Sequence, residues 1–240
     1  MKRKKVIVVG ATSGIGMGLA RIFVQNQYQV GITGRRLPLL HQLCNENPDA
    51  CFVKAMDVTQ PDEAIRQLEM LVAEMGGLDL LILNSGTGHR NEALDFTLEL
   101  PAIQTNVLGF TALADWAFNY FSEQKGGHLA VVSSVAGIRG SRFAPAYGAS
   151  KAYQISYMQA LRQKAKKLKL QVTITDIRPG FVDTAMAQGD GLFWVASVEK
   201  AAQQIYKALS QKKEIVYITK RWRLVAGFIR LLPRMIYEKV

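Results

Sequence analysis

The chain has 240 residues, of which 49% are hydrophobic, so it is long and apolar enough to bury one large α/β core. Its formal net charge is +11, with basic residues dispersed over the start "MKRKK", a run "RQKAKKLK" and the end beyond Lys220. This charge favours attraction to anionic cofactors, acidic lipid surfaces or nucleic acid. No aromatic-interleaved basic platform or recognised nucleic-acid module accompanies it, so we expect no nucleic-acid partner.

The cysteines and histidines indicate neither a disulfide framework nor a metal site. Cys44 and Cys51 are too few for such a framework, and we interpret them as ordinary thiols. His41, His89 and His128 form no cluster at metal-ligand spacing, so no metal is expected. The apolar run "VIVV" is shorter than a signal-peptide core, and no stretch reaches membrane-spanning length. We therefore expect a cytoplasmic protein, with the C-terminal segment as the candidate for a membrane association.

Short β-branched runs alternate with longer segments of helical spacing along the chain. The runs that predict strands are "KVIVVG", "QVGITG", "CFVKAMD", "LDLLILN", "HLAVVSS", "VTITDIRPG" and "EIVYIT". Apolar strands separated by helices are typical of a parallel sheet covered on both faces. The sequence therefore predicts an α/β fold of the Rossmann type, a doubly wound parallel sheet of about seven strands in a single domain. We assign this domain to residues 1–219 and treat residues 220–240 as a C-terminal extension.

The first predicted strand runs into a glycine-rich loop, "VVGATSGIG". Gly10, Gly14 and Gly16 stand between this strand and the first predicted helix, with the spacing G-x-x-x-G-x-G. Glycines let the backbone turn tightly and approach a ligand, and the N–H groups and dipole of a helix N-terminus favour a pyrophosphate. A purely structural turn is the alternative, but the strand, loop and helix context favours nucleotide binding.

The second predicted strand ends in "TGRR", where a dinucleotide-binding fold often carries an acidic residue that reads the ribose 2′-OH. Arg35 and Arg36 suit a 2′-phosphate instead, and no Asp or Glu stands in this stretch. We expect NADP(H) to be preferred, with NAD(H) as the alternative cofactor. Solvation of one or both arginines at a helix start is the alternative role.

The stretch "APAYGASK" sets Tyr147 four residues before Lys151. On a helix these positions share one face, so the two side chains would project into the same space. Taken alone, such a pair is more often a solvated surface pair than a catalytic one. Its meaning depends on the other motifs of the chain.

The glycine loop, the pair of Tyr147 and Lys151 and several further motifs occur along the chain in an order that resembles the short-chain dehydrogenase/reductase (SDR) family. The resemblance extends from Lys4 to about Ile218. The loop after the first strand looks like the cofactor loop of that family, and Asp57 in "MDVT" matches the position that holds the adenine. "LNSG" is similar to the Asn-Asn-Ala-Gly of the family, with Leu83 in place of the first Asn, which would remove a polar contact near the cofactor. "PGFVDT" looks like the segment that closes on the nicotinamide.

The resemblance implies a catalytic tetrad and a cofactor site. The tetrad consists of Asn106, Ser134, Tyr147 and Lys151. The cofactor residues are Gly10, Thr12, Ser13, Gly14, Ile15, Gly16, Arg35, Arg36, Asp57, Val58, Asn84, Gly86, Tyr147, Lys151, Pro179, Gly180, Val182 and Thr184. Arg35 is expected to outweigh Arg36, because it directly follows the position that is acidic in NAD-preferring relatives.

The tetrad gives the tyrosine and lysine pair a chemical role. A free tyrosine has a pKa near 10, and the Lys151 ammonium together with a positively charged nicotinamide would favour its ionisation. Tyr147 would then exchange a proton with the substrate oxygen, while Ser134 hydrogen-bonds that oxygen. Ser134 lies thirteen residues before Tyr147, the usual separation in the family, so we interpret Ser133 as a packing or backbone partner. In the family, the asparagine at the position of Asn106 kinks its helix and holds a water that joins the lysine at the position of Lys151 to solvent. Local capping of backbone groups by Asn106 is an alternative role that is compatible with this one.

Two segments beyond the tetrad carry open alternatives. Leu192, Phe193 and Trp194 suggest a lid over an apolar carbonyl or alcohol, or equally packing against the core or a second subunit. In the C-terminal extension, Trp222, Val225, Ile229 and Leu232 follow helical spacing, and Leu224, Phe228 and Leu231 widen the apolar face. We expect an ordered helix that buries the first set against protein. Its apolar face could pack on the domain or a partner subunit, or lie on a membrane surface; the resemblance implies a homodimer or homotetramer.

The sequence as a whole predicts an NADP-dependent oxidoreductase that transfers a hydride between nicotinamide and an apolar carbonyl/alcohol substrate, with Tyr147 as general acid/base. A catalytically silent dinucleotide-binding regulator on the same fold is the alternative. The complete tetrad argues against it, because a sensor needs no proton chemistry.

Overall fold

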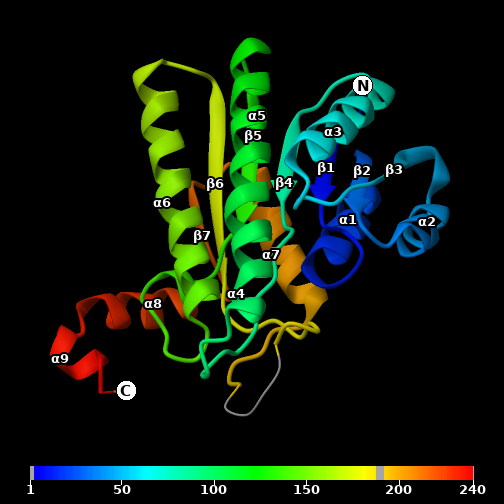
Figure 1. The fold of residues 1–240 in the computed structure, drawn as a ribbon. Helices are drawn as coiled ribbons and strands as arrows, with labels where there is room; N and C mark the ends of the chain where they lie inside the picture. Colours follow the sequence, from blue (N-terminus) through cyan, green and yellow to red (C-terminus); the bar gives the residue numbers. More distant parts are fainter. Residues whose placement is uncertain (1–2, 188–191, 240) are drawn as a thin grey trace.

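A computed structural model describes residues 3–187 and 192–239, and its centre is one parallel β-sheet (Figure 1). The seven strands lie in the order β3-β2-β1-β4-β5-β6-β7, all parallel. Their bounds are β1 Lys5–Val9, β2 Gln29–Gly34, β3 Cys51–Ala55, β4 Leu80–Leu83, β5 Gly127–Val132, β6 Val172–Pro179 and β7 Ile215–Ile218. The predicted doubly wound α/β fold of a single domain is confirmed.

Helices cover both faces of this sheet, which is why the central strands are apolar on both sides. One face packs against α3 Pro61–Met75, α5 Phe110–Glu123 and α6 Pro145–Lys167. The other packs against α1 Gly14–Gln25, α2 Leu37–Asn45 and α7 Val198–Ser210. The remaining helical segments are η1 Pro48–Ala50, α4 Phe96–Ile103, the π-helical turn η2 Gln104–Gly109, η3 Val135–Gly137, α8 Trp222–Leu231 and α9 Arg234–Tyr237.

The strand order determines where a ligand can bind. From β1 the chain adds β2 and β3 in one lateral direction, and β4 then pairs with the opposite edge of β1. The strand order therefore reverses between β1 and β4. At such a switch point the loops at the carboxyl ends of neighbouring strands diverge and leave a crevice. The glycine loop follows β1, and the segments that carry the predicted tetrad and "PGFVDT" follow β4, β5 and β6. All of them therefore lie at the same edge of the sheet.

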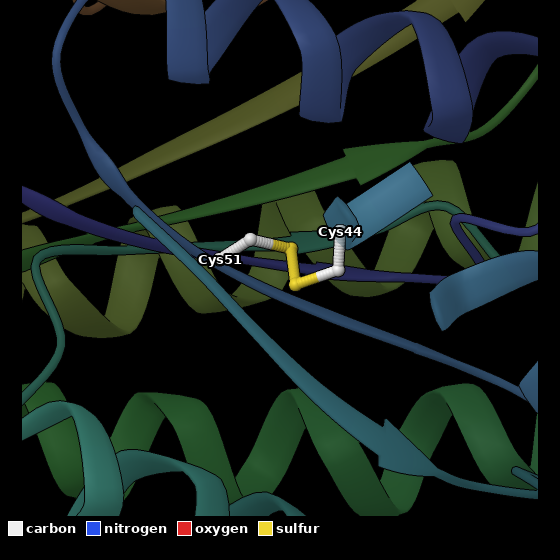
Figure 2. The surroundings of a disulfide bond; sticks show 2 residues. All are labelled: Cys44 and Cys51. Carbon is white, nitrogen blue, oxygen red and sulfur yellow. A yellow bond between two sulfur atoms is a disulfide. The ribbon is translucent and has the colours of Figure 1, made fainter. Parts of the chain in front are cut away.

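The interpretation of the two cysteines as ordinary thiols is wrong in this structure. Figure 2 shows a disulfide between Cys44, in α2, and Cys51, at the start of β3. The short turn η1 folds the chain back between the two elements, so the cysteines lie 5.3 Å apart between their Cα atoms although seven positions separate them. The small number of cysteines argues against a framework of several disulfides. It says nothing about a single disulfide between two cysteines that a turn brings together.

The C-terminal extension forms α8 and α9, which project from the domain at the end of the molecule where the loops after β5 and β6 lie (Figure 1). Trp222 is buried, whereas Val225, Ile229 and Leu232 are half-buried. Leu224, which the sequence assigns to the same widened apolar face, is exposed. Packing on the domain thus covers only part of the apolar surface of α8.

Candidate active site

The glycine loop after β1 adopts a left-handed backbone conformation at two of its positions, which favours glycine there. Gly10 and Gly14 adopt φ of +87° and +55°, in the left-handed region. A Cβ on Gly16 would lie 2.1 Å from the carbonyl oxygen of Gly10, so the loop and the start of α1 touch backbone to backbone. The Asn84 side chain donates a 2.7 Å hydrogen bond to the same carbonyl and ties the loop after β4 to it.

The start of α1 meets the requirements for binding a pyrophosphate. Ser13 is the N-cap residue, but its side chain makes no capping hydrogen bond, and the first turn carries no acidic residue. The N–H groups and positive dipole end of the helix are therefore not neutralised by these side chains. A Cβ on Gly14 would lie 3.0 Å from Cγ2 of Thr184, so the segment after β6 lies against this loop. The loop and the helix start together fit the phosphates of NAD(P).

The two arginines after β2 have different surroundings, although both are exposed. Arg36 donates hydrogen bonds to the hydroxyl oxygens of Thr12 at 2.8 Å and of Ser13 at 3.0 Å. Within residues 3–187 and 192–239, no hydrogen bond or ion pair engages the Arg35 guanidinium. Arg36 thus braces the cofactor loop, and Arg35 is the arginine without a protein partner among the described residues.

The segment after β3 carries Asp57, which is predicted to hold the adenine, and Val58, a second predicted cofactor residue. Asp57 is half-buried, and its Oδ1 accepts hydrogen bonds from the backbone N–H of Thr59 at 3.0 Å and from its hydroxyl at 2.8 Å. Val58 is buried, and its carbonyl oxygen would lie 2.1 Å from a Cβ on Gly109. The turn around Asp57 is therefore fixed by its own hydrogen bonds and by the close approach of η2 to Val58.

Tyr147 and Lys151 lie on the first two turns of α6, as their spacing predicts. The loop after β4 passes close to both. A Cβ on Gly88 would lie 2.3 Å from Cδ2 of Tyr147, and a Cβ on Gly86 would lie 3.2 Å from Nζ of Lys151. Gly86 belongs to the predicted cofactor residues, whereas Gly88 does not, because the sequence marks it only by its place in a glycine-containing loop. The absence of a side chain at both positions lets this loop approach the pair.

Burial raises the pKa of the Tyr147 phenol above its ordinary value of 10.0, and the Ser134 side chain opposes this rise. Burial thus outweighs the lowering of the Tyr147 pKa that was expected from Lys151, whose Nζ lies 5.8 Å from the centroid of the phenol ring. A phenol with a raised pKa keeps its proton at neutral pH. Tyr147 is thus in the protonation state that can donate to a carbonyl oxygen.

Lys151 is a buried cation, with 3% of its surface exposed. Its Nζ donates one hydrogen bond to the carbonyl oxygen of Val132 and one to Oε1 of Gln154, both at 3.0 Å. Burial lowers the pKa of Lys151 from 10.5 to about 8, and the carboxylate of Asp176 partly opposes this effect. At neutral pH the ammonium form is therefore still favoured.

Gln154 is a site residue that the sequence analysis missed. It is 1% exposed, and besides accepting from Lys151 it donates from Nε2 to the backbone carbonyl oxygen of Asn106 at 3.0 Å. Gln154 thus bridges two members of the predicted tetrad. The available signal was its spacing, because positions 147, 151 and 154 share one helix face.

Asn106 lies fully buried in the π-helical turn between α4 and α5, which is consistent with the kink expected at this position. Its side chain accepts from the N–H of Thr87 at 3.0 Å and donates to the carbonyl oxygen of Thr87 at 2.7 Å. It also donates to the hydroxyl of Ser150 at 3.0 Å. Asn106 therefore joins the loop after β4 to α6.

The two adjacent serines that follow β5 have different hydrogen-bond partners and different roles. Ser133 is buried and donates to Oδ1 of Asp176 at 2.5 Å and to the carbonyl oxygen of Ile177 at 3.0 Å. Ser134 is the N-cap of η3, where its hydroxyl accepts from the N–H of Ala136 at 3.1 Å and reaches the carbonyl oxygen of Pro179 at 3.5 Å. Of the two roles expected for Ser133, packing or a backbone partner, the structure shows a buried partner of the backbone and of Asp176, while Ser134 is the serine beside Tyr147.

Glu99, in α4, is a second residue that the sequence did not indicate. One carboxylate oxygen accepts from the backbone N–H of Ala146 at 2.7 Å, and the other accepts from Nδ2 of Asn91 at 2.5 Å. Ala146 immediately precedes Tyr147 in the first turn of α6. Glu99 therefore anchors the helix start that carries Tyr147, through a contact 47 positions apart in sequence.

The predicted lid packs against the C-terminal extension. The rings of Phe181, Phe193 and Trp194 each lie within 6.1 Å of the Trp222 ring, measured between centroids. Trp222 also covers Gly180, where a Cβ would lie 2.0 Å from the indole ring. Residues 188–191, which precede these side chains, lie outside the described residues. Phe193 and Trp194 are thus joined to the segment after β6 and to α8 by one aromatic cluster.

The fold and this edge of the sheet define a dinucleotide-binding protein whose titratable side chains lie beside the cofactor crevice. Residues 4–192 match the family described as short chain dehydrogenase. An uncharacterized oxidoreductase of Myxococcus xanthus is 37% identical over 191 residues, which cover 78% of this chain and 75% of that protein. The chain therefore belongs to the short-chain dehydrogenase/reductase family, and it is an oxidoreductase that acts on CH–OH or C=O groups with NAD(P).

Solved structures show the same fold at lower sequence identity. A short chain dehydrogenase/reductase from Burkholderia phymatum in complex with NAD has a TM-score of 0.85 at 15% identity, covering 94% of this chain and 92% of that chain. The closed form of serine dehydrogenase complexed with NADP+ has a TM-score of 0.79 at 23% identity, covering 89% and 93%. These likenesses concern the fold, and the two structures carry different forms of the cofactor.

Proposed function

We propose that this chain is an NADP(H)-preferring oxidoreductase for an apolar carbonyl/alcohol substrate, with Tyr147 as the general acid/base. The observation that carries the proposal is the grouping of Tyr147, Ser134 and Lys151 beside the crevice that follows β1 and β4. When bound, NAD(P) supplies or accepts the hydride. The protein then has to hold the substrate oxygen and move one proton to or from it.

Each side chain has a definite task in this proposal. Tyr147 gives its proton to the carbonyl oxygen during reduction and takes one from the alcohol during oxidation. Ser134 hydrogen-bonds the same oxygen and orients it. Lys151, which remains an ammonium at neutral pH and donates to two acceptors, stabilises the phenolate left after proton donation. Asn106 and Gln154 hold Lys151 and the loop after β4 in place.

The cofactor preference rests on the arginines that follow β2. Arg35 lies at the position where a 2′-phosphate would be read, and it has no protein partner among the described residues. A guanidinium there would bind that phosphate through charge-assisted hydrogen bonds. Arg36 supports the loop through Thr12 and Ser13, so its contribution would apply to both cofactors.

The apolar character of the substrate rests on the lid. Phe193 and Trp194 are 49% and 46% exposed although they pack on Trp222, so they present apolar surface beside the segment after β6. Exposed aromatic side chains near a catalytic crevice favour an apolar substrate group. A homodimer or homotetramer remains our prediction for the assembly, to be checked by sedimentation velocity.

The experiment compares the wild type with Tyr147→Phe in a cofactor-oxidation screen over ketones, aldehydes, sugars and lipid-like carbonyls. We expect an apolar carbonyl to be reduced with NADPH, and Tyr147→Phe to lower turnover by orders of magnitude while NADPH still binds. Lys151→Ala should lower turnover similarly and also weaken NADPH binding. Comparable turnover in Tyr147→Phe would refute the proton-transfer role.

The competing function is a dinucleotide-binding regulator without turnover. It predicts cofactor binding with no oxidation of NADPH by any carbonyl in the screen, in the wild type as in both variants. The buried, hydrogen-bonded state of Lys151 favours the enzyme, because a sensor gains nothing from burying a cation next to a phenol.

A further inference from the structure

The helix α8 has two apolar faces, and only one of them is covered. Trp222 and Ala226 are buried on the covered face, at 4% and 2% exposure. Leu224, Phe228 and Leu231 follow at spacings of four and three, so they share one face of the helix. Their positions on a helical wheel lie opposite Trp222 and Ala226.

The second face is exposed to an unusual degree for large apolar side chains. Leu224, Phe228 and Leu231 are 77%, 65% and 84% exposed. In the next helix, α9, Met235 and Ile236 are also exposed, at 78% and 51%. We call Leu224, Phe228 and Leu231 the α8 apolar face. Large apolar side chains exposed together on one helix face of a folded domain indicate an interaction site.

The position of the α8 apolar face is held by contacts with the domain. Arg139, in the loop after η3, donates hydrogen bonds to the carbonyl oxygens of Ile229 at 3.0 Å and Leu232 at 2.7 Å. Its guanidinium also lies over the ring of Tyr237, whose hydroxyl donates to the carbonyl oxygen of Gly140 at 2.6 Å. These contacts fix α8 with the apolar face outward.

Basic side chains surround this face. The basic residues between positions 220 and 239 are Lys220, Arg221, Arg223, Arg230, Arg234 and Lys239. Glu238 is the only acidic residue in that stretch, and it pairs with Arg234. Arg223 and Arg230 are seven residues apart, so they line one flank of the helix beside the exposed leucines. Apolar side chains flanked by cations are typical of helices that lie in the plane of a bilayer surface.

We propose that the α8 apolar face docks this protein on a lipid bilayer whose surface carries anionic headgroups. Leu224, Phe228 and Leu231 enter the boundary between headgroups and acyl chains, and Arg223 and Arg230 remain at the level of the headgroups. Within the described residues, no helix is both long and apolar enough to cross a membrane. The docking is therefore peripheral, with α8 parallel to the surface.

Charge favours a bilayer over a second copy of the chain. A two-fold contact places the same patch of both subunits face to face. The α8 faces of two copies would bring Arg223 and Arg230 of each chain close to the same cations of the other, with one acidic side chain each in the stretch to offset them. Like charges at a contact are unfavourable, whereas anionic headgroups complement the cations.

The lid lies on the same part of the molecule. The Arg221 guanidinium sits over the ring of Trp194, 5.1 Å from its centroid, and Phe193, Trp194 and Val195 are each nearly half exposed. Docking through α8 would bring these side chains toward the same bilayer. This consequence needs no assumption about which substrate is turned over.

The test is co-sedimentation of the full-length protein with vesicles of phosphatidylcholine alone or mixed with phosphatidylglycerol. The double variant Leu224→Ser/Leu231→Ser removes two exposed side chains of the α8 face. The matched control Met70→Ser/Leu168→Ser removes two exposed apolar side chains, 51% and 55% exposed, from α3 and from the C-cap of α6. Thermal unfolding and NADPH binding confirm that each variant is folded.

We expect the wild type and the control to bind the anionic vesicles, and the α8 variant to bind them about tenfold more weakly. Arg223→Ser/Arg230→Ser should weaken binding to anionic vesicles but not to neutral ones. Part of the wild-type binding should persist at high salt, because inserted side chains are not screened.

Three results would overturn the proposal. The first is equal vesicle binding by the α8 variant and the control. The second is complete loss of wild-type binding at high salt, since charge alone would then explain it. The third is a change in the sedimenting mass of the α8 variant without a change in vesicle binding, which would assign the face to a second copy.

Discussion

Replacing Gln154 by leucine tests whether the residue missed by sequence reasoning tunes the buried lysine. The leucine has a similar size but neither accepts from Lys151 nor donates to the carbonyl oxygen of Asn106. A hydrogen bond from a charged donor contributes about 1.5–3 kcal/mol. Because only the ammonium form of Lys151 donates strongly to Oε1, losing this bond should lower the pKa of Lys151 below its value of about 8, by about one unit or more.

The assay is the pH dependence of kcat/KM for carbonyl reduction with saturating NADPH. Activity that needs the Lys151 ammonium is present below the pKa of Lys151 and is lost as the pH rises through it. Gln154→Leu should therefore lose activity at a lower pH than the wild type. Gln154→Glu places a carboxylate beside Lys151, so it should raise the pKa and move the alkaline loss to higher pH.

A general loss of packing would lower activity at every pH. It therefore cannot move the alkaline loss of activity to lower pH in one variant and to higher pH in the other. The reasoning is refuted if both variants keep the wild-type pH profile, or if both move it in the same direction. Thermal unfolding at neutral pH measures the purely structural cost of losing the two buried hydrogen bonds, separately from the profile.

Two further predictions concern the cofactor and the core. Arg35→Ala should weaken NADPH binding by about tenfold or more and hardly change NADH binding. Arg36→Ala should weaken the binding of both cofactors, because Arg36 donates hydrogen bonds to Thr12 and Ser13 in the cofactor loop. Titration of both cofactors measures these losses, and equal losses for NADPH and NADH in Arg35→Ala would contradict the 2′-phosphate role. Burial, aided by the charge of Lys212, lowers the pKa of His128 from 6.5 to about 4. Between these values the unfolded chain binds the proton and the folded protein does not, so the free energy of unfolding should fall by about 3 kcal/mol as the pH drops from 6.5 to 4. Urea unfolding across this range should show a flatter dependence in His128→Gln, and an unchanged slope would show that His128 is not the group responsible.

The strand and helix order followed from local patterns, because apolar β-branched runs and helical spacing are encoded over a few residues. The glycine loop and the pair of Tyr147 and Lys151 were also local, since each motif lies within one loop or one helix face. The link between Asn106 in η2, Ser134 after β5 and α6 came from a family resemblance, not from any local pattern.

Contacts between segments that are distant in sequence could not be predicted from local patterns. Gln154 reaches Asn106 across 48 positions, and Glu99 reaches Ala146 across 47, so no local spacing predicts either hydrogen bond. The pairing of Cys44 with Cys51 is close in sequence, but it depended on the turn η1 that brings α2 and β3 together. For α8, the sequence determined that the helix is amphipathic and basic, because helical periodicity is local. The sequence did not determine which apolar face of α8 is buried. That depends on the position of the end of β7 relative to the aromatic lid, and this position is set only when the whole sheet has formed.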